Sequence, residues 1–156
     1  MPITFKFLTV KSIPRLWWSA PRALTLRPPF RSFLGLVFGL ILFGLGEALA
    51  CRVAVQVGSA LAYLHGEGIA HRDIKPQNVL FADITPNAPA KLCDFGFAMV
   101  GRKARTVCGT PQYMAPELVQ AGAGPYGTHE VDLWAFGAMV FEMLEGRPAF
   151  SGVGLT

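Results

Sequence analysis

The stretch HRDIKPQN, residues 71–78, holds an acid, a lysine and an amide within eight residues. We expect it to form a loop, because the apolar residues before it have the spacing of a helix and residues 79–81 after it are typical of a strand. Asp73 and Asn78 lie five residues apart in this loop, with Lys75 between them. This arrangement has no obvious packing purpose, so it indicates a chemical role.

A second carboxylate is expected to join this loop. Asp94 follows the next predicted strand, 91–93, and pairing of the two strands in a short hairpin would bring Asp94 beside Asn78. An amide oxygen and a carboxylate are hard ligands suited to Mg²⁺, which often shares its coordination shell with phosphates. Asp73 would then be free to accept a proton from an incoming hydroxyl, and Lys75 would neutralise charge on a transferring phosphoryl group.

Four motifs follow one another along the chain: His71-Arg72-Asp73 with Lys75 and Asn78, Asp94-Phe95-Gly96, Ala115-Pro116-Glu117, and Asp132-Leu133-Trp134 with Gly137. In this order they resemble motifs of the eukaryotic protein kinases. In that family they form the catalytic loop, the metal-binding motif, the end of the activation segment and the buried central helix of the large lobe. The match covers about residues 52–150, roughly two thirds of the chain.

The resemblance implies a role for each motif residue. Asp73 would be the catalytic base and Lys75 the lysine on the phosphate side of the site. Asn78 and Asp94 would hold Mg²⁺ and, through it, ATP. The residues expected to be structural are His71, Phe95, Glu117 and Asp132.

Two features are similar to serine/threonine kinases rather than tyrosine kinases: Lys75 after the triplet 71–73, and Gly109-Thr110 before Pro111 in the activation segment, residues 94–117. Thr110 would hydrogen-bond near Asp73 and help to shape the substrate groove. Thr106 is placed like a regulatory phosphorylation site, and its phosphate would add about −1.5 to −2 charge that Arg72 could pair. The strings KLCDFGFA and GTPQYMAPEL are similar to those of calcium/calmodulin-dependent and Fused-type kinases.

The fold class that follows is α+β: a kinase-like large lobe, mainly helical, with a short β-hairpin. We expect a long helix near 48–65 that ends at glycines, a hairpin across 79–93, an irregular segment to 117 and a helix at 130–145. The last helix is apolar almost all round, which is typical of a helix buried on every side at the centre of a larger body. In an incomplete lobe this helix is expected to lose part of its cover and to expose apolar surface.

The lobe is expected to be incomplete, with the small lobe absent. No glycine-rich loop precedes a strand lysine, and no lysine occurs between Lys11 and Lys75. The later helices of the large lobe are also expected to be absent, which would deprive Glu117 of an arginine partner. The chain is therefore interpreted as a partial serine/threonine kinase, with a non-catalytic binding or decoy module as the alternative.

The first 51 residues differ from the rest. Residues 1–31 contain six basic residues and no acid, and we expect this arm to be disordered. Residues 32–51 are mostly apolar and long enough to span about 30 Å as a helix. Three explanations stay open for this segment: a membrane helix, a targeting segment, or a stretch foreign to the kinase domain, which we assign to 52–156.

Charge and cysteine content limit the partners. Residues 32–156 contain eight basic and ten acidic residues, a net of −2, so the basic character belongs to the arm and nucleic acid is not an expected partner. The three cysteines show no metal-binding spacing and indicate free thiols in a reducing compartment. We therefore expect a cytoplasmic protein, or a membrane-anchored one with a cytoplasmic kinase portion, whose partners are ATP and a protein substrate.

Overall fold

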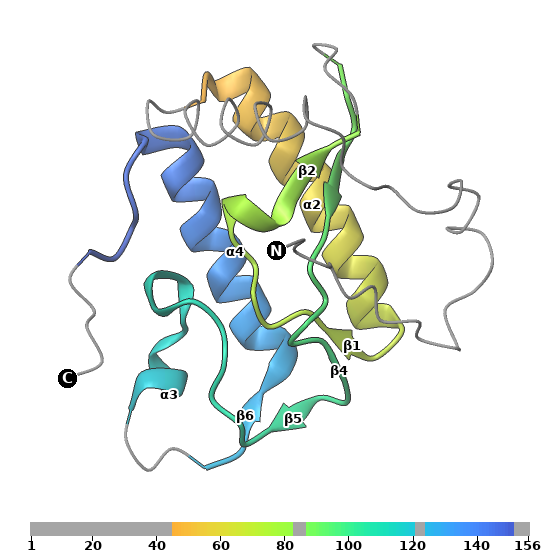
Figure 1. Ribbon diagram of the computed structural model, residues 1–156, viewed down its shortest axis with the longest axis vertical. Coiled ribbons are helices and arrows are strands. Elements are labelled where there is room, and N and C mark those ends of the chain that lie inside the picture. Colours follow the sequence, from red (N-terminus) through yellow and green to blue (C-terminus); the bar gives the residue numbers. More distant parts are fainter. Residues whose placement is uncertain (1–44, 83–86, 121–123, 152–156) are drawn as a thin grey trace, which may run out of the picture.

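The computed structural model describes residues 45–82, 87–120 and 124–151 (Figure 1). The basic arm 1–31 and residues 32–44 of the apolar segment lie outside the described residues. Two long helices, α2 and α4, pack against each other, and short antiparallel strand pairs and irregular segments surround them.

The elements follow one another in an order close to the predicted one. The helices are α2 (Glu47–Gly66), α3 (Pro116–Val119) and α4 (Thr128–Glu145), and two short 3₁₀ turns are η2 (Pro76–Asn78) and η3 (Pro111–Tyr113). The strands are β1 (Ile69–Ala70), β2 (Val79–Phe81), β3 (Ala90–Leu92), β4 (Met99–Val100), β5 (Lys103–Ala104) and β6 (Tyr126–Gly127), which pair as β1–β4, β2–β3 and β5–β6.

Helix α2 confirms the long helix that was predicted near 48–65. Its buried residues recur every three or four positions, so they form one inward face. The chain leaves the helix through Gly68, whose φ of 71° is the left-handed conformation that glycine adopts without steric strain. The residues of the buried face are Ala50, Val53, Val57, Leu61 and Leu64.

The main core lies between α2 and α4. Met139 and Met143 of α4 meet the inward face of α2, and Ile74 and Val79 from the loop and strand β2 close the same cluster. A second, smaller cluster joins the start of α4 to the segment around α3; its buried members are Ala115, Leu118, Tyr126 and Val131. Helix α4 therefore contributes to both clusters and connects them.

The hairpin β2–β3 is also present, with β3 one residue earlier than the predicted strand 91–93. The register pairs Val79 with Leu92 and Phe81 with Ala90. Beyond the register, the backbone N–H of Cys93 donates to the carbonyl of Asn78 at 2.9 Å. This extra bond carries the pairing to the residue before Asp94.

Helix α4 begins two residues earlier than predicted, and Gly146 ends it with a left-handed φ of 68°. Part of its apolar surface has no cover among the described residues, which agrees with the loss of cover predicted for this helix. Leu133 is 56% exposed, and Leu144 and Trp134 are also exposed, with Trp134 stacked on Phe150 at 5.3 Å between ring centroids. The two clusters cover one side of the helix, and no described element covers the other.

Among the described residues, α2 is the one helix that length and composition would allow to cross a membrane. Its apolar face, however, belongs to the core between α2 and α4. The helix also crosses the predicted domain boundary between residues 51 and 52. Residues 45–50 are attached to the core, because Ala50 is buried and the backbone N–H of Leu45 bonds to the carbonyl of Met143.

The core predicts a contrast between two leucines. Leu61→Ala removes a side chain that is 1% exposed and should lower the free energy of unfolding by about 2–5 kcal/mol. Leu133→Ala, at the exposed side of α4, should lower it by less than about 1 kcal/mol. Urea unfolding followed by circular dichroism measures both, and equal losses would contradict the assignment of the core.

Candidate active site

The carboxylate of Asp132 holds the loop 71–78 in place. It lies fully buried in the first turns of α4, where Oδ2 accepts the backbone N–H of His71 at 2.8 Å and Oδ1 accepts that of Arg72 at 2.7 Å. The Nε2 of His65, near the end of α2, lies 3.0 Å from Oδ2. Arg72 has a φ of 65°, a conformation that costs a non-glycine residue energy and persists where the surroundings hold it.

Four of the predicted site residues meet at the carboxylate of Asp73. Its Oδ1 accepts the hydroxyl of Thr110 at 2.8 Å, and its Oδ2 lies 2.8 Å from the ammonium of Lys75 and 3.0 Å from Nδ2 of Asn78. The ammonium of Lys75 also donates to Thr110 at 2.7 Å. The predicted contact between Thr110 and Asp73 is thus present, and it joins the activation segment to the loop.

The carboxylate of Asp73 has room for one more hydrogen-bond partner. The side chain of Asp73 is 4% exposed, but an ammonium, a hydroxyl and an amide surround it. A carboxylate has about four lone-pair positions, so three donors leave one for a further hydroxyl. Asp73 could therefore accept a hydrogen bond from an incoming alcohol and then its proton.

Asp94 lies next to this group rather than in it. Its neighbour Cys93 bonds to the backbone of Asn78, while the carboxylate of Asp94 is exposed and accepts the N–H of Gly96 at 3.3 Å. Its φ of 60° turns the chain sharply after β3.

The side chains present fit a magnesium ion. The Nδ2 of Asn78 donates to Asp73. The Oδ1 of Asn78 accepts no hydrogen bond from any donor within the described part of the chain. An amide oxygen and an exposed carboxylate from Asp94 are the hard-oxygen donors that Mg²⁺ prefers. Asn78 and Asp94 are therefore the residues that could hold the ion.

His71 lies beneath the site as a buried, neutral side chain. Its Nε2 donates to the carbonyl of Cys93 at 3.0 Å, and its Nδ1 accepts the N–H of Asp73 at 3.3 Å. Its ring stacks at a tilt on that of Phe95, 4.9 Å between centroids. Burial lowers the pKa of His71, although the charges of Asp132, Asp73 and Asp94 partly offset this. His71 and Phe95 are thus placed to support the loop from below.

The thiols beside the site are protonated at neutral pH. Burial raises the pKa of Cys93 to about 11, and the negative charge of Asp94 acts in the same direction. Burial also raises the pKa of Cys108. Neither is placed to act as a nucleophile, because the thiolate is the reactive form.

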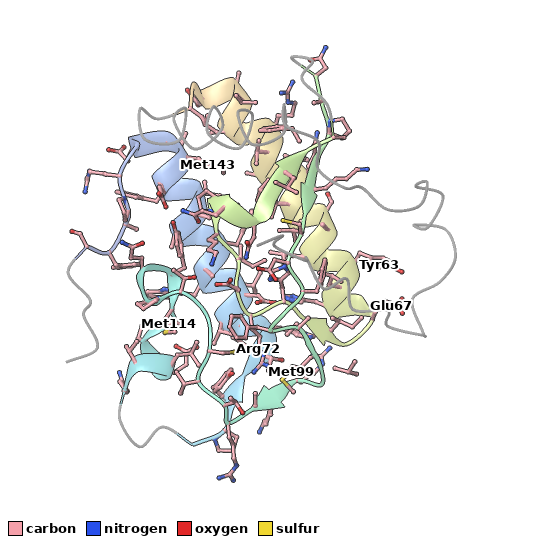
Figure 2. All side chains as sticks on the ribbon, in the orientation of Figure 1. Tyr63, Glu67, Arg72, Met99, Met114 and Met143 are labelled. Carbon is pink, nitrogen blue, oxygen red and sulfur yellow. The ribbon has the colours of Figure 1, made fainter. Side chains whose placement is uncertain are left out.

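Arg72 connects the loop to the activation segment. Figure 2 shows it at the foot of α4, between the labelled Met99 and Met114 in this view. Its Nε donates to the carbonyl of Phe97 at 2.7 Å. The backbone of Gly109 passes so close that an added Cβ would lie 2.8 Å from the carbonyl oxygen of Arg72, and its φ of 109° also suits glycine alone.

Two predicted site residues lie apart from the carboxylate cluster. Thr106 is exposed, and its backbone carbonyl accepts the hydroxyl of Tyr126 at 2.7 Å. Glu117 is half-buried in α3 and forms no ion pair or hydrogen bond with other described residues.

Several residues that shape the site were not singled out from the sequence. They are His65, which contacts Asp132; Tyr126, which contacts both Arg72 and Thr106; and the buried pair of Tyr113 and Glu142. The hydroxyl of Tyr113 donates to Glu142, and burial raises the pKa of this tyrosine. No motif signals these contacts, since each joins elements that lie far apart in the chain.

The family of the protein kinase domain matches residues 42–154, well over half of the chain. The chain belongs to the protein kinase domain family.

Similar proteins are serine/threonine kinases, so the predicted resemblance to that type is confirmed. Serine/threonine-protein kinase chk-2 of Caenorhabditis elegans is 46% identical over 109 residues, which are 69% of this chain and 23% of that protein. Calcium/calmodulin-dependent protein kinase type IV of Homo sapiens is 45% identical over 107 residues, 67% of this chain and 22% of that protein.

Serine/threonine-protein kinase fused of Drosophila melanogaster is 46% identical over 110 residues, 68% of this chain and 13% of that protein. The two predicted subfamily resemblances are thus equally represented, and the identities favour neither. The chain spans about a quarter or less of the length of these relatives.

The bonds of Asp132 predict a large effect of one isosteric change. Asp132→Asn should lower the free energy of unfolding by at least about 2 kcal/mol, because an amide donor would face the N–H groups that the carboxylate now accepts. Urea unfolding measures the loss. Asp94→Asn is the matched control: its carboxylate is exposed and asparagine tolerates its positive φ, so a change within about 0.5 kcal/mol is expected. Similar losses of unfolding free energy in the two variants would argue against the role of Asp132 in holding the loop 71–78.

The buried imidazole predicts how stability depends on pH. Because folding lowers the pKa of His71, the unfolded chain binds more protons near pH 6, so stability is full above about pH 6.5 and falls as the pH drops below it. His71→Gln should reduce this slope by up to about 1.4 kcal/mol per pH unit. The slope that remains includes a contribution from His129. Burial and the nearby charges of His65 and Arg102 lower the pKa of His129 as well. Urea titrations from pH 7 to 5 test this, and an unchanged slope would refute it.

Proposed function

We propose that this chain carries the phosphoryl-transfer site of a serine/threonine protein kinase, which moves the γ-phosphate of ATP to a serine or threonine hydroxyl of a protein. The observation that carries the proposal is that the carboxylate of Asp73 contacts the side chains of Lys75, Asn78 and Thr110 at the same time. Family membership and the serine/threonine kinases among its relatives support the same reaction class.

In the proposed reaction the substrate hydroxyl bonds to the γ-phosphorus while the bond to the bridging oxygen breaks and ADP leaves. Asp73 accepts the proton of the hydroxyl at the carboxylate position that its three donors leave open. Lys75 extends beside Asp73 and offsets negative charge on the transferring group. Thr110 hydrogen-bonds to the side chains of both Asp73 and Lys75 and borders the substrate groove.

Asn78 and Asp94 are the proposed ligands of Mg²⁺. The ion, when bound with ATP, neutralises charge on the phosphates and helps to orient them. The hairpin β2–β3 fixes the spacing of the two side chains, since Cys93 pairs with Asn78 directly before Asp94.

Three further assignments belong to this proposal. The described residues correspond to the large lobe of a kinase, with Thr106 as a regulatory phosphorylation site that Arg72 would pair. A cytoplasmic location is proposed from the three free cysteines, which suit a reducing compartment.

The second candidate is a kinase lobe that binds kinase substrates or regulators without catalysis. The exposed apolar side of α4, with Leu133, Trp134 and Leu144, favours it, since such surface commonly marks an interaction site. Calorimetry with Mg²⁺ and ATP discriminates between the candidates: micromolar affinity for the nucleotide supports the enzyme, and no binding supports the module.

The role of Asp73 predicts the result of a transfer assay. The chain is incubated with labelled ATP, Mg²⁺ and a generic protein substrate, and incorporation into serine or threonine is counted. Asp73→Asn should lower the rate by about 10²–10⁴, the contribution of a general base. Glu145→Gln, which changes an exposed carboxylate far along α4, should leave it unchanged. If the native chain incorporates no more label than Asp73→Asn, the proposed catalysis by this chain is refuted.

A further inference from the structure

One hydroxyl links Arg72 to the exposed threonine of the activation segment. The hydroxyl of Tyr126 accepts a hydrogen bond from Nη1 of Arg72 at 3.2 Å and donates one to the backbone carbonyl of Thr106 at 2.7 Å. Tyr126 is 6% exposed, and its ring packs in the second core cluster, so the position of this hydroxyl is fixed.

The guanidinium of Arg72 has only neutral partners among the described residues. Its Nε bonds to the carbonyl of Phe97 and its Nη1 to Tyr126, and it forms no ion pair within the described ranges. The nearby thiol of Cys108 is also neutral, because burial raises its pKa. A half-buried cation among neutral acceptors, with N–H donors still unused, is a site that an anion would stabilise.

These contacts also fix the direction in which Arg72 points. Phe97 and Tyr126 hold the guanidinium at two of its nitrogens, so it cannot rotate freely about its side-chain bonds. Because the same hydroxyl holds the Thr106 carbonyl, a phosphate on Thr106 would arrive beside a guanidinium that is already oriented. Orienting the group beforehand reduces the entropy lost when the charged pair forms.

We propose that Tyr126 is a positioning residue for regulation. Its hydroxyl holds the guanidinium of Arg72 next to the backbone of Thr106, so that a phosphate on Thr106 pairs with Arg72. This rests on the proposed function in one respect, the assignment of Thr106 as a phosphorylation site. Without the hydroxyl, both groups remain, but Arg72 is no longer directed at the phosphate.

The test is the second pKa of a phosphate placed on Thr106. The full chain is made with phosphothreonine at position 106, and ³¹P NMR titration measures the pKa, which is ordinarily about 6. A paired guanidinium lowers it, since an opposite charge favours the dianion. Tyr126→Phe should raise it again by roughly 0.5 or more, and Arg72→Gln should raise it further.

A matched control separates positioning from stability. Tyr113→Phe also removes a buried hydroxyl near the activation segment, but this hydroxyl contacts Glu142 and not Arg72, so the phosphate pKa should not change. No ATP turnover enters the measurement, so a failure of the proposed catalysis leaves the readout intact.

Two outcomes would overturn the proposal. In one, Arg72→Gln raises the phosphate pKa and Tyr126→Phe does not, which would make Tyr126 a packing residue only. In the other, neither variant changes it. If Tyr126→Phe does not fold, the ¹³Cζ resonance of Tyr126 in the native chain must move on phosphorylation of Thr106 and must not move in Arg72→Gln; any other result overturns the proposal.

Discussion

The site depends on one buried carboxylate, that of Asp132. A buried charge is costly unless donors surround it, and here two backbone N–H groups of the loop 71–78 and the imidazole of His65 supply them. The same bonds fix Arg72 in a left-handed conformation, which directs the chain so that Asp73 follows in a defined position. Removing the carboxylate would leave the loop with unpaired buried donors and no fixed direction.

Around this anchor, the side chains of the site come from segments far apart in the chain. Lys75 and Asn78 reach Asp73 from the same loop, whereas Thr110 reaches it from the activation segment. Gly109 allows that segment to pass against the carbonyl of Arg72, where a side chain would clash. Asp73, Lys75 and Thr110 are therefore coupled through their side chains, and a shift in the activation segment would move Thr110 relative to Asp73.

The buried titratable groups show why the loop is stable near neutral pH. His71 is neutral because one ring nitrogen donates a hydrogen bond and the other accepts one, and because burial lowers the pKa of its imidazole. The carboxylates of Asp73 and Asp132 lie among hydrogen-bond donors. One side of α4 therefore supports a highly polar site, while its other side exposes Leu133, Trp134 and Leu144.

The sequence by itself determined the family, the helices α2 and α4, the hairpin and the chemical residues around Asp73, because these follow from local periodicity, glycine positions and motif spacing. It did not reveal that Asp132 holds the loop 71–78 or that Tyr126 joins Arg72 to Thr106. Each of these depends on which distant segments meet, because a hydrogen bond between residues 54 or 61 positions apart produces no periodic pattern in the sequence. Only the packing of the tertiary structure decides them.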